Sequence, residues 1–407
     1  MDLQQQLFAA ALKIEPPLFI ENVIFRSGVL HIYIGYDKDA QFVCPICHEK
    51  HDVYDSIPRT WRHLNFFQYK CYLHFNQPRV DCPNCGKNSV TPDWTRERSG
   101  FTLLFEAFIV ALAKSGLPFS EISKAVGEYD TRLRRIVDYY VETSYNTKDF
   151  SSVTEIAIDE TSSKKGHRYV TVVSNQADGT VLFATEGKDS ETIKAFTDEA
   201  VKHNLEPDNI EKITMDMSIA FQAGASVYLP NATMIFDRFH IMKLLNEAVD
   251  KVRREEQKIN PLLKKTRYVW LKNRDNLTAK QLKTLMNLEN ENLDTAEAYR
   301  LKVTFQDICK SCAGKLEAEI AIIAWIKAAE QSGLDPLINF AETLRSHWIG
   351  VINAFCTSLS NGISEGINSL IQQVKRRARG YKNIRHFINM IYLVKGGLTV
   401  PVFPLAW

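Results

Sequence analysis

The sequence lacks the features that would mark a membrane protein, an exported protein or a repeat protein. No apolar run among its 407 residues reaches the length that spans a bilayer. The first residues, MDLQQQLFAAALKIEPP, contain an acidic residue and no basic segment, so they do not resemble a signal peptide. We find no internal repeat and no low-complexity linker. These absences predict a cytoplasmic protein without membrane contact, and the length predicts two to four domains.

Acidic residues are also missing from one long stretch. The chain as a whole is almost balanced, with a formal net charge of +2. From Gly366 to Trp407, however, there is no Asp or Glu. A local cationic patch of this kind fits a polyanionic partner such as nucleic acid, and plain surface charge is the alternative. The cations of the stretch are Lys375, Arg376, Arg377, Arg379, Lys382, Arg385 and Lys395.

Cysteine is scarce, and half of the eight cysteines form two pairs. Without an export signal, they indicate reduced thiols and a metal site rather than disulfides. Cys44-Pro-Ile-Cys47 and Cys82-Pro-Asn-Cys85 are knuckles in which both thiolates of a tight turn can reach one ion. The two pairs predict a structural four-sulfur Zn²⁺ site, and four buried free thiols are the alternative. We assign three nearby candidates to hairpin or core positions instead: His48, His63 and Cys71.

The N-terminal part of the chain reads as two modules, a zinc-binding one and a DNA-binding one. Residues 1–95 contain short alternating strands around the cysteine pairs, which predicts a zinc-binding β module. Residues 96–150 read as three helices with a Gly-containing turn, which is a helix-turn-helix pattern. Ser120 is expected to cap the second helix, and Asp130 or Thr131 the third. Candidates for DNA contact on the third helix, with a solvated face as the equal alternative, are Arg132, Arg134 and Arg135.

The rest of the chain alternates strands and helices and then becomes helical. Residues 151–258 follow the order βββαβαβα, the connectivity of the first part of an RNase H-like core. Residues 259–350 are helical and polar, which predicts an all-helical insertion domain. Residues 351–407 return to the core as its final helices. The predicted fold class is therefore multidomain α+β: zinc-binding module, helix-turn-helix, and an RNase H-like α/β core interrupted by helices.

Three carboxylates, distant in sequence, fall where such a core could bring them together. Asp159 ends the apolar strand EIAIDE, and Asp216 ends the strand KITMDM. Glu365 lies on the late helix NGISEGINSL, with Asn361 and Asn368 on the same face. The first and fourth strands of the core are expected to be neighbours. Carboxylates gathered in this way can hold two Mg²⁺ ions, which catalyse phosphodiester chemistry.

Each of these acids has an alternative interpretation. An Asp at a strand end often caps the next helix, and a Glu on a helix is usually solvated. Asp237 also ends a strand and competes with Asp216 for the catalytic position. Asp237 and His240 are expected either to support the site from behind or to stabilise the exit of the fifth strand. Glu160 should face away from Asp159, because side chains alternate along a strand.

Three runs in this order resemble the catalytic segments of DDE transposases from bacterial insertion sequences of the ISL3 family. They are AIDETS, TMDMSIAF with YLPNATMIFDRFHI, and SEGINSLIQQVKRRARGYKNIRHF. The zinc knuckles resemble the N-terminal module of the same family. The resemblance implies that Asp159, Asp216 and Glu365 form the catalytic triad with two Mg²⁺ ions, Mn²⁺ being an alternative. It also implies that Asp237-x-x-His240 matches a signature of related transposases.

The resemblance further implies partners. Such an enzyme binds double-stranded DNA, both transposon ends and target, as a homodimer or higher oligomer on the bacterial nucleoid. Four cations would then hold the phosphate backbone near the site: Lys375, Arg376, Arg377 and Arg379. Two other functions stay open from the residues. One is a non-transposing RNase H-like nuclease, and the other is a DNA-binding protein derived from a transposase that no longer cuts.

Overall fold

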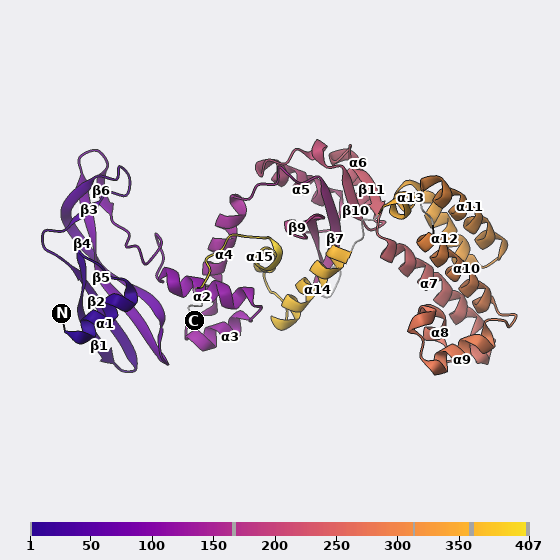
Figure 1. Ribbon diagram of the computed structural model, residues 1–407, viewed down its shortest axis with the longest axis horizontal. Helices are drawn as coiled ribbons and strands as arrows, with labels where there is room; N and C mark the ends of the chain where they lie inside the picture. Colours follow the sequence, from indigo (N-terminus) through magenta and orange to yellow (C-terminus); the bar gives the residue numbers. More distant parts are fainter. Residues whose placement is uncertain (1, 165–167, 312–313, 358–361, 404–407) are drawn as a thin grey trace.

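The computed structural model describes residues 2–164, 168–311, 314–357 and 362–403. The molecule is elongated, with a β module at one end, a helical body at the other and a mixed sheet between them (Figure 1). The polypeptide follows this order from left to right in Figure 1 and then doubles back, so that its last two helices lie beside the central sheet.

The N-terminal module is a six-stranded sheet with one helix, α1 (Leu3–Leu12), packed on it. The strand order is β1-β2-β5-β4-β3, and β6 pairs with β5. Strand bounds are β1 Leu18–Arg26, β2 Val29–Tyr36, β3 Gln41–Val43, β4 Lys50–Phe66, β5 Tyr69–Cys82 and β6 Gly86–Ser89. The expectation of short strands was wrong for β4 and β5, which are 17 and 14 residues long. Their mutual pairing lets both continue from the hydrophobic core to the cysteine knuckles.

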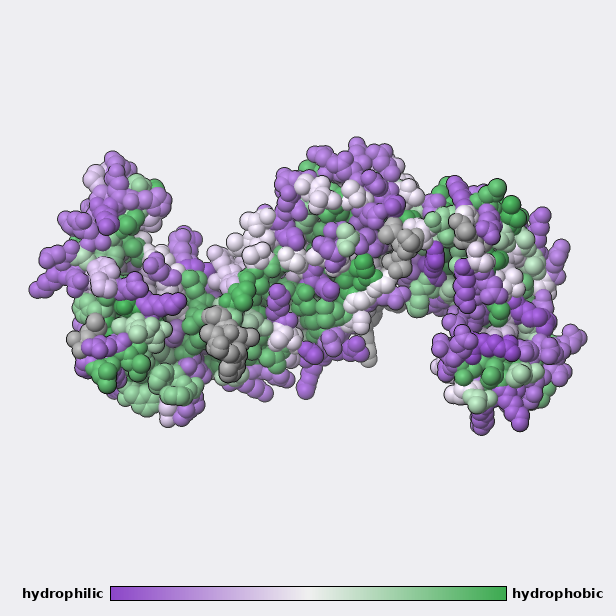
Figure 2. Space-filling view, viewed as in Figure 1, coloured by the Kyte–Doolittle hydropathy of each residue, from purple (hydrophilic) through white to green (hydrophobic). Residues whose placement is uncertain are grey.

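The two ends of this module differ in surface chemistry. Figure 2 shows hydrophobic surface gathered at the end that carries α1 and β1, and hydrophilic surface at the knuckle end. Exposed rings at the hydrophobic end include Phe25 and Phe67, which are 56% and 80% accessible. Beneath them, Ile20, Ile32 and Leu73 form the buried core. The module therefore has its own core, separate from the rest of the chain.

Three helices follow, as the sequence predicted: α2 (Leu103–Lys114), α3 (Phe119–Val126) and α4 (Asp130–Asn146). Gly127 ends α3 in the left-handed region at a φ of 68°, which a residue without a Cβ adopts without strain. The predicted caps were wrong. Pro118 precedes α3, so Ser120 lies inside its first turn, and Tyr129 precedes α4. Proline fixes φ near its helical value, and this pre-organisation starts α3 one residue before Ser120.

The central sheet has the strand order β11-β10-β7-β8-β9. Its bounds are β7 Glu155–Lys164, β8 Arg168–Asn175, β9 Val181–Glu186, β10 Lys212–Met215 and β11 Thr233–Phe236. The first three strands pair antiparallel, while β10 pairs parallel with both β7 and β11. The predicted neighbourhood of the first and fourth strands is thus confirmed. Two helices connect the later strands, α5 (Ser190–Lys202) and α6 (Ile219–Tyr228).

One detail of this sheet differs from the prediction. Asp159 does not end its strand, because β7 continues to Lys164 through antiparallel pairing with β8. The parallel neighbour β10 stops at Met215, so β7 loses its partner on that side near Asp159. The polar residues after Asp159 remain in the strand because β8 still satisfies their backbone groups.

Helices α7 (Arg238–Glu256) to α13 (Trp348–Cys356) build the body at the far end. Between them lie α8 (Arg267–Leu271), α9 (Ala279–Leu288), α10 (Asp294–Ser311), α11 (Lys315–Gln331) and α12 (Asp335–Ser346). No strand occurs among the described residues of this stretch. Phe305, Trp325 and Phe340 pack edge to face at its centre, with centroids 5.0–5.7 Å apart. Helix α13 returns to the sheet, where Asn353 donates to the Met234 carbonyl at 2.9 Å.

The chain ends with α14 (Gly362–Arg377) and α15 (Ile384–Lys395), which lie beside the central sheet and α4 (Figure 1). The Tyr392 hydroxyl of α15 accepts a hydrogen bond from the Ala184 amide at 2.9 Å, which fastens the helix to β9. Of the helices described, none is both long and apolar enough to cross a membrane.

Candidate active site and nucleic-acid interface

Three aspartates lie at one level across three neighbouring strands. In the register of β10 and β7, Thr214 is opposite Ala157, so Asp216 falls opposite Asp159 two residues later. In the register of β10 and β11, Met215 is opposite Phe236, so Asp216 also falls beside Asp237. The Asp237 amide donates to the Met215 carbonyl at 2.9 Å, which extends this pairing to the aspartate itself. We call Asp159, Asp216 and Asp237 the aspartate row.

The hydrogen bonds of the row distinguish its members. Asp216 accepts from the Ser218 amide at 2.9 Å, in the turn that leads into α6. Asp237 caps α7 through the Phe239 amide at 3.0 Å and also contacts His240 Nδ1 at 2.7 Å. The expectation that an aspartate at a strand end caps the following helix therefore holds for Asp237. Its remaining oxygen orients the imidazole of His240 toward the row.

The electrostatics show that these groups act on one another. The pKa of Asp159 is raised to about 6, chiefly by burial; the Glu160 amide and His240 oppose the rise, and the negative charges of Asp216 and Asp237 add to it. The pKa of His240 is raised, chiefly by its hydrogen bond to Asp237, with Asp159 and Asp216 contributing. Three carboxylates and one imidazole thus act on one another through charge, although their ligand atoms do not all lie within 4.8 Å of one another among the described residues. The excess negative charge suits a divalent cation.

Helix α14 packs on β7 and is fastened to it. Asn368 Nδ2 donates to Asp159 Oδ2 at 2.6 Å. One turn later, Gln372 Nε2 donates to Thr161 Oγ1 at 2.6 Å and to the Ser162 carbonyl at 3.1 Å. The segments joined by these bonds are more than 200 residues apart in sequence. The Asn368 contact with Asp159 is closer than the sequence implied, since Asn368 was only expected to share a face with Glu365.

Glu365 lies in the first turn of α14, three residues before Asn368, and its side chain is exposed. The carboxylates of Asp159, Asp216 and Glu365 do not form a group within 4.8 Å, among the residues that the structure describes. Asn361, the other predicted neighbour of Glu365, lies outside the described residues. The structure therefore sets the two aspartates at one level of the sheet, while Glu365 lies exposed on α14, three residues before the Asn368 that contacts Asp159.

Arg238 is a residue that sequence reasoning missed. It follows Asp237 directly, and its guanidinium donates to the Ala354 carbonyl at 2.6 Å and the Thr357 carbonyl at 2.7 Å. It therefore ties the end of α13, from which the chain returns to α14, to the start of α7. No sequence motif predicts this contact, because its acceptors are backbone carbonyls about 120 residues away in the sequence.

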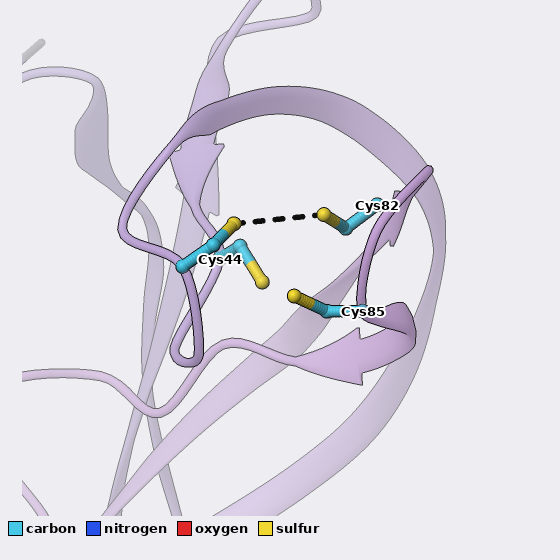
Figure 3. A group of neighbouring side chains, drawn as sticks. Cys44, Cys82 and Cys85 are labelled. Carbon is cyan, nitrogen blue, oxygen red and sulfur yellow. Dashed lines mark hydrogen bonds between the residues drawn. The ribbon is translucent and has the colours of Figure 1, made fainter.

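The second cluster of functional residues lies at the knuckle end of the N-terminal module. The thiols of Cys44, Cys47, Cys82 and Cys85 offer ligand atoms that all lie within 4.8 Å of one another. The Cys47 and Cys82 sulfurs are 3.6 Å apart. Tetrahedral zinc with bonds of about 2.3 Å requires sulfur separations of about 3.8 Å, so the four thiols fit this ion. Figure 3 shows the labelled thiols of Cys44, Cys82 and Cys85 close together.

The backbone of the first knuckle favours a thiolate. The amides of Cys47 and Ile46 lower the pKa of the Cys44 thiol to about 7. Burial and neighbouring thiols instead raise the pKa of Cys85 to about 12. Four crowded thiols need a cation before all of them can ionise, and Zn²⁺ supplies that charge. Glu49 and His51 lie beside Cys47, a neighbourhood that the sequence reasoning did not single out.

The three nearby candidates that were not assigned as zinc ligands occupy core or turn positions. His63 hydrogen-bonds Thr102 Oγ1 at 2.9 Å, and burial lowers its pKa to about 4. Cys71 is buried, and burial raises its pKa to about 11. His48 is exposed, with a φ of 61° in the turn of the first knuckle. The expectation that all three are hairpin or core residues is confirmed.

Comparison with known proteins decides the identity of the chain. The model of the ISL3 DDE family, described as transposase, matches residues 156–391, more than half of the sequence. The chain belongs to the ISL3 family of transposases. A helix-turn-helix domain of transposase family ISL3 matches residues 90–141. The zinc-finger of transposases IS204, IS1001, IS1096 and IS1165 matches residues 40–85, over the cysteine cluster.

Curated relatives agree with this family. The transposase for insertion sequence element IS1001 from Bordetella parapertussis is 28% identical over 349 residues, which cover 82% of this chain and 84% of the relative. The transposase for insertion sequence element IS1557 from Mycobacterium tuberculosis is 25% identical over 430 aligned positions, covering 96% of each chain. The protein is thus a transposase with a zinc ribbon and a DNA-binding helix-turn-helix, and the family is one of enzymes that cleave and transfer DNA.

The arginines predicted to contact DNA occupy different environments on α4 of this transposase. Arg132 pairs with Glu128 at 2.5 Å and lies over the Phe101 ring. Arg134 pairs with Asp130 at 3.5 Å and lies over the Phe119 ring. Arg135 is exposed, and no ion pair is seen for it among the described residues. The first two therefore have structural contacts in addition to any with DNA.

The junction of the zinc module and the helix-turn-helix contains a buried arginine. Arg62 of β4 is 1% exposed and lies 3.5 Å from Glu128. It also donates to the Val126 carbonyl at 3.0 Å, at the end of α3. Because Glu128 pairs with Arg132 as well, the transposase links the zinc module to its third DNA-binding helix through one carboxylate.

The basic residues at the end of α14 also divide into two groups. Lys375 donates to the Ser162 carbonyl, and Arg377 donates to the Ser115 carbonyl at 3.1 Å, so both hold elements together. Arg376 and Arg379 are exposed, and Arg376 contacts only its own helix, at the Gln372 carbonyl, in the described part of the chain. The transposase therefore presents Arg376 and Arg379 to solvent where α14 ends.

Proposed function

We propose that this transposase cleaves and joins DNA with Asp159, Asp216 and Glu365 as its catalytic carboxylates. The observation that carries the proposal is the position of α14 over two matched strands. Asp159 and Asp216 are at one level of β7 and β10, and Asn368 fastens the Glu365 helix to Asp159. Glu365 precedes Asn368 by about 4.5 Å of helix rise, so rotation of its exposed side chain brings its carboxylate toward the row.

The donor set fits Mg²⁺, with Mn²⁺ as an alternative. Hard oxygen ligands and retained water suit these ions, and a few carboxylates suffice to hold them. The raised pKa of Asp159 reflects its burial first, with the nearby charges of Asp216 and Asp237 adding to the rise. Two ions held by Asp159, Asp216 and Glu365 would supply Lewis acidity at the attacking and leaving oxygens.

Further residues position the proposed catalytic carboxylates. Asp237 holds His240 through a 2.7 Å contact, and this hydrogen bond raises the pKa of His240, which favours its charged form beside Asp159 and Asp216. In our proposal Asp237 and His240 support the catalytic carboxylates through hydrogen bonding and charge, and neither carries a reacting group. Asn368 orients Asp159 so that its carboxylate faces α14.

The reaction has two phosphoryl transfers. In the first, water attacks the phosphorus at the end of the element, the bond from phosphorus to the 3′ oxygen breaks, and a 3′-hydroxyl remains on the element. In the second, this hydroxyl attacks a phosphorus of the target DNA, and the displaced 3′ oxygen of the target leaves. The protein's carboxylates fix the geometry of both displacements, and no covalent enzyme intermediate is required.

The fold supports an RNase H-like core, which we assign to residues 151–258 and 351–407, interrupted by a helical insertion at 259–350. The five-stranded order with three antiparallel and two parallel strands is the reason for this assignment. We assign residues 1–95 to the zinc-binding module and 96–150 to the helix-turn-helix. In this scheme α7 begins in the core and packs against α10 and α12 of the insertion.

The two N-terminal modules are proposed to recognise the ends of the element, with Arg135 as the contact that α4 leaves most exposed. Joining two ends needs two active sites, so we propose a homodimer or higher oligomer on DNA. As an enzyme of DNA it works where the bacterial chromosome lies, in the cytoplasm on the nucleoid.

The proposal is tested with purified protein and a duplex that carries a terminal repeat from the DNA flanking the reading frame. With Mg²⁺, wild-type protein should cut the end and join it to target DNA, and a chelator should stop both reactions. Asp159→Asn, Asp216→Asn and Glu365→Gln should each lower the cleavage rate by at least about a hundredfold. Asp198→Asn, an exposed carboxylate on α5, is the matched control and should cut normally.

The products separate the alternatives. Cleavage without joining would identify a non-transposing nuclease, and binding without cleavage would identify a DNA-binding protein derived from a transposase. Unimpaired cleavage by any one of the three variants would remove that residue from the mechanism.

A further inference from the structure

A large groove separates the helix-turn-helix from the C-terminal helices. Its volume is about 1280 Å³, and its walls come from three parts of the chain. One wall is the turn between α2 and α3 with the start of α4, and another is the end of β7. The third wall is the turn from α14 to α15. The groove therefore lies between the module that reads DNA and the helix that carries Glu365.

The lining of the groove is strongly cationic. Its one acidic residue, Asp130, is already paired with Arg134 at 3.5 Å. Burial and the nearby charge of Arg376 lower the pKa of Lys375, as expected where cations gather without an anion. The cationic lining residues are Arg134, Lys164, Lys375, Arg376, Arg379 and Lys382.

The walls are tied to one another by hydrogen bonds, while three of the cations, Arg376, Arg379 and Lys382, are exposed. Arg377 donates to the Ser115 carbonyl at 3.1 Å and joins α14 to the end of α2. Lys164 donates to the Lys382 carbonyl at 2.9 Å and joins β7 to the turn after α14. Gly116 has a φ of 84°, and a Cβ there would lie 2.7 Å from Arg377. The groove is thus formed within one chain, between its DNA-binding and catalytic parts.

Two elements, β7 and α14, lead from the proposed catalytic residues to this groove, and the number of residues along each gives the distance. Along β7, Ser163 lies four residues beyond Asp159, which is about 13 Å at 3.3 Å per residue. Along α14, Lys375 lies ten residues beyond Glu365, which is about 15 Å at 1.5 Å per residue. Because successive phosphates of one strand are spaced about 3.4 Å along a DNA duplex, both distances correspond to about four to five base pairs.

We propose that this groove holds the phosphate backbone of the transposon end between the segment read by the helix-turn-helix and the bond that is cut. The bound DNA is a duplex, and its phosphates about four to five nucleotides from the cleaved bond lie against the cations of the α14–α15 turn. The DNA would then join the helix-turn-helix and the Glu365 helix of the same chain. In this inference the position of the cleaved bond rests on the proposed function, whereas the binding of DNA in the groove does not.

The test begins with binding in a chelator, where no cleavage occurs. The groove variant replaces three exposed cations, Arg376→Gln, Arg379→Gln and Lys382→Gln. Each phosphate contact contributes about −0.9 to the slope of log affinity against log salt, so the slope should become shallower by about three. The charge-matched control replaces three exposed lysines of the helical body, Lys280→Gln, Lys283→Gln and Lys327→Gln, and should keep the wild-type slope.

Phosphate ethylation interference on the same duplex gives the position. The groove variant should lose interference about four to five nucleotides from the cleaved bond and keep it under the helix-turn-helix. An unchanged slope, or interference lost only at other positions, would overturn the inference. If wild-type protein failed to cut in Mg²⁺, the proposed function would fail, while the slopes would still decide whether the groove binds DNA.

Discussion

The burial of the Asp159 carboxylate beside two like charges predicts that Asp159→Asn makes the metal-free protein more stable while it abolishes cleavage. The folded-state pKa of Asp159 is about 6, against an ordinary value of 3.8. At neutral pH this difference of about two units destabilises the ionised fold by up to about 3 kcal/mol, at 1.36 kcal/mol per unit. The side chain is only half-buried, so solvent screening reduces the figure to about 1–2 kcal/mol.

Asparagine can keep the hydrogen bonds of Asp159. Its oxygen can accept from the Glu160 amide, as the Asp159 carboxylate does at 2.7 Å. Its amide can donate to Asn368 once that side chain turns over, because the buried Asn368 Oδ1 has no hydrogen-bond partner among the described residues. Loss of charge assistance offsets part of the gain. We expect a net gain of about 1 kcal/mol, which raises the apparent Tm by about 2–4 °C.

The sign of the pH dependence follows from the raised pKa. Below pH 3.8 the carboxyl is protonated in both folded and unfolded chains, so wild type and variant should be equally stable. As the pH rises from about 4 to 6, the unfolded carboxyl ionises first, and the wild type loses stability relative to the variant. Above pH 6 the difference should stay constant.

Thermal unfolding in a chelator at several pH values measures this effect, with Asp198→Asn as a control that should change little. Mg²⁺ should then reverse the order. At ten times its dissociation constant, the ion stabilises the wild type by about 1.4 kcal/mol, whereas the variant should gain less. A variant that melts at or below the wild-type temperature in chelator at pH 7 would refute the reasoning.

Three other predictions concern the supports of the site. Cys82→Ser should lower the bound zinc from about one ion per chain to well below one, measured by elemental analysis, because three thiolates leave the tetrahedron open. Arg62→Met should leave the buried Glu128 short of a partner and destabilise the junction by about 3–5 kcal/mol, seen as faster proteolysis between the zinc module and α2. Asn368→Asp should add a carboxylate to the aspartate row, lowering the Tm at pH 7 in chelator and leaving it little changed near pH 4.

The controls for these variants are nearby residues of the same type. Cys356→Ser, at an exposed thiol, should keep the zinc content. Arg59→Met, at an exposed position of the same strand as Arg62, should not change the rate of proteolysis. Equal destabilisation by the two arginine variants would show that the buried ion pair does not hold the junction.

The order of helices and strands could be predicted from the sequence because it depends on local patterns. Alternating apolar residues predicted the five strands of the central sheet, and the connectivity implied that β7 and β10 are neighbours, as they are. The three helices before the sheet were also found, although their caps were not. The end of β7 was misplaced at Asp159 because the polar residues beyond it are held by β8, a partner that local periodicity cannot reveal.

The site was predictable only in part. The cysteine spacing predicted four clustered thiols, since a tight turn fixes both members of each pair. Asp159 and Asp216 were chosen from their places after apolar strands, and the register sets them side by side. The position of Asp237 in the same row, the Asn368 contact and the Arg238 anchor depend on pairings between distant segments.

The sequence by itself determined the elements, their order, the metal-binding knuckles and the family, because turns, strands and helices follow from the spacing of residues close together in the chain. The tertiary structure alone decided which polar groups meet across 200 residues, how α14 lies on β7, and that a cationic groove forms beside the helix-turn-helix. Those contacts arise when separate surfaces pack together, and their free energy depends on complementary shapes and charges that no local pattern records.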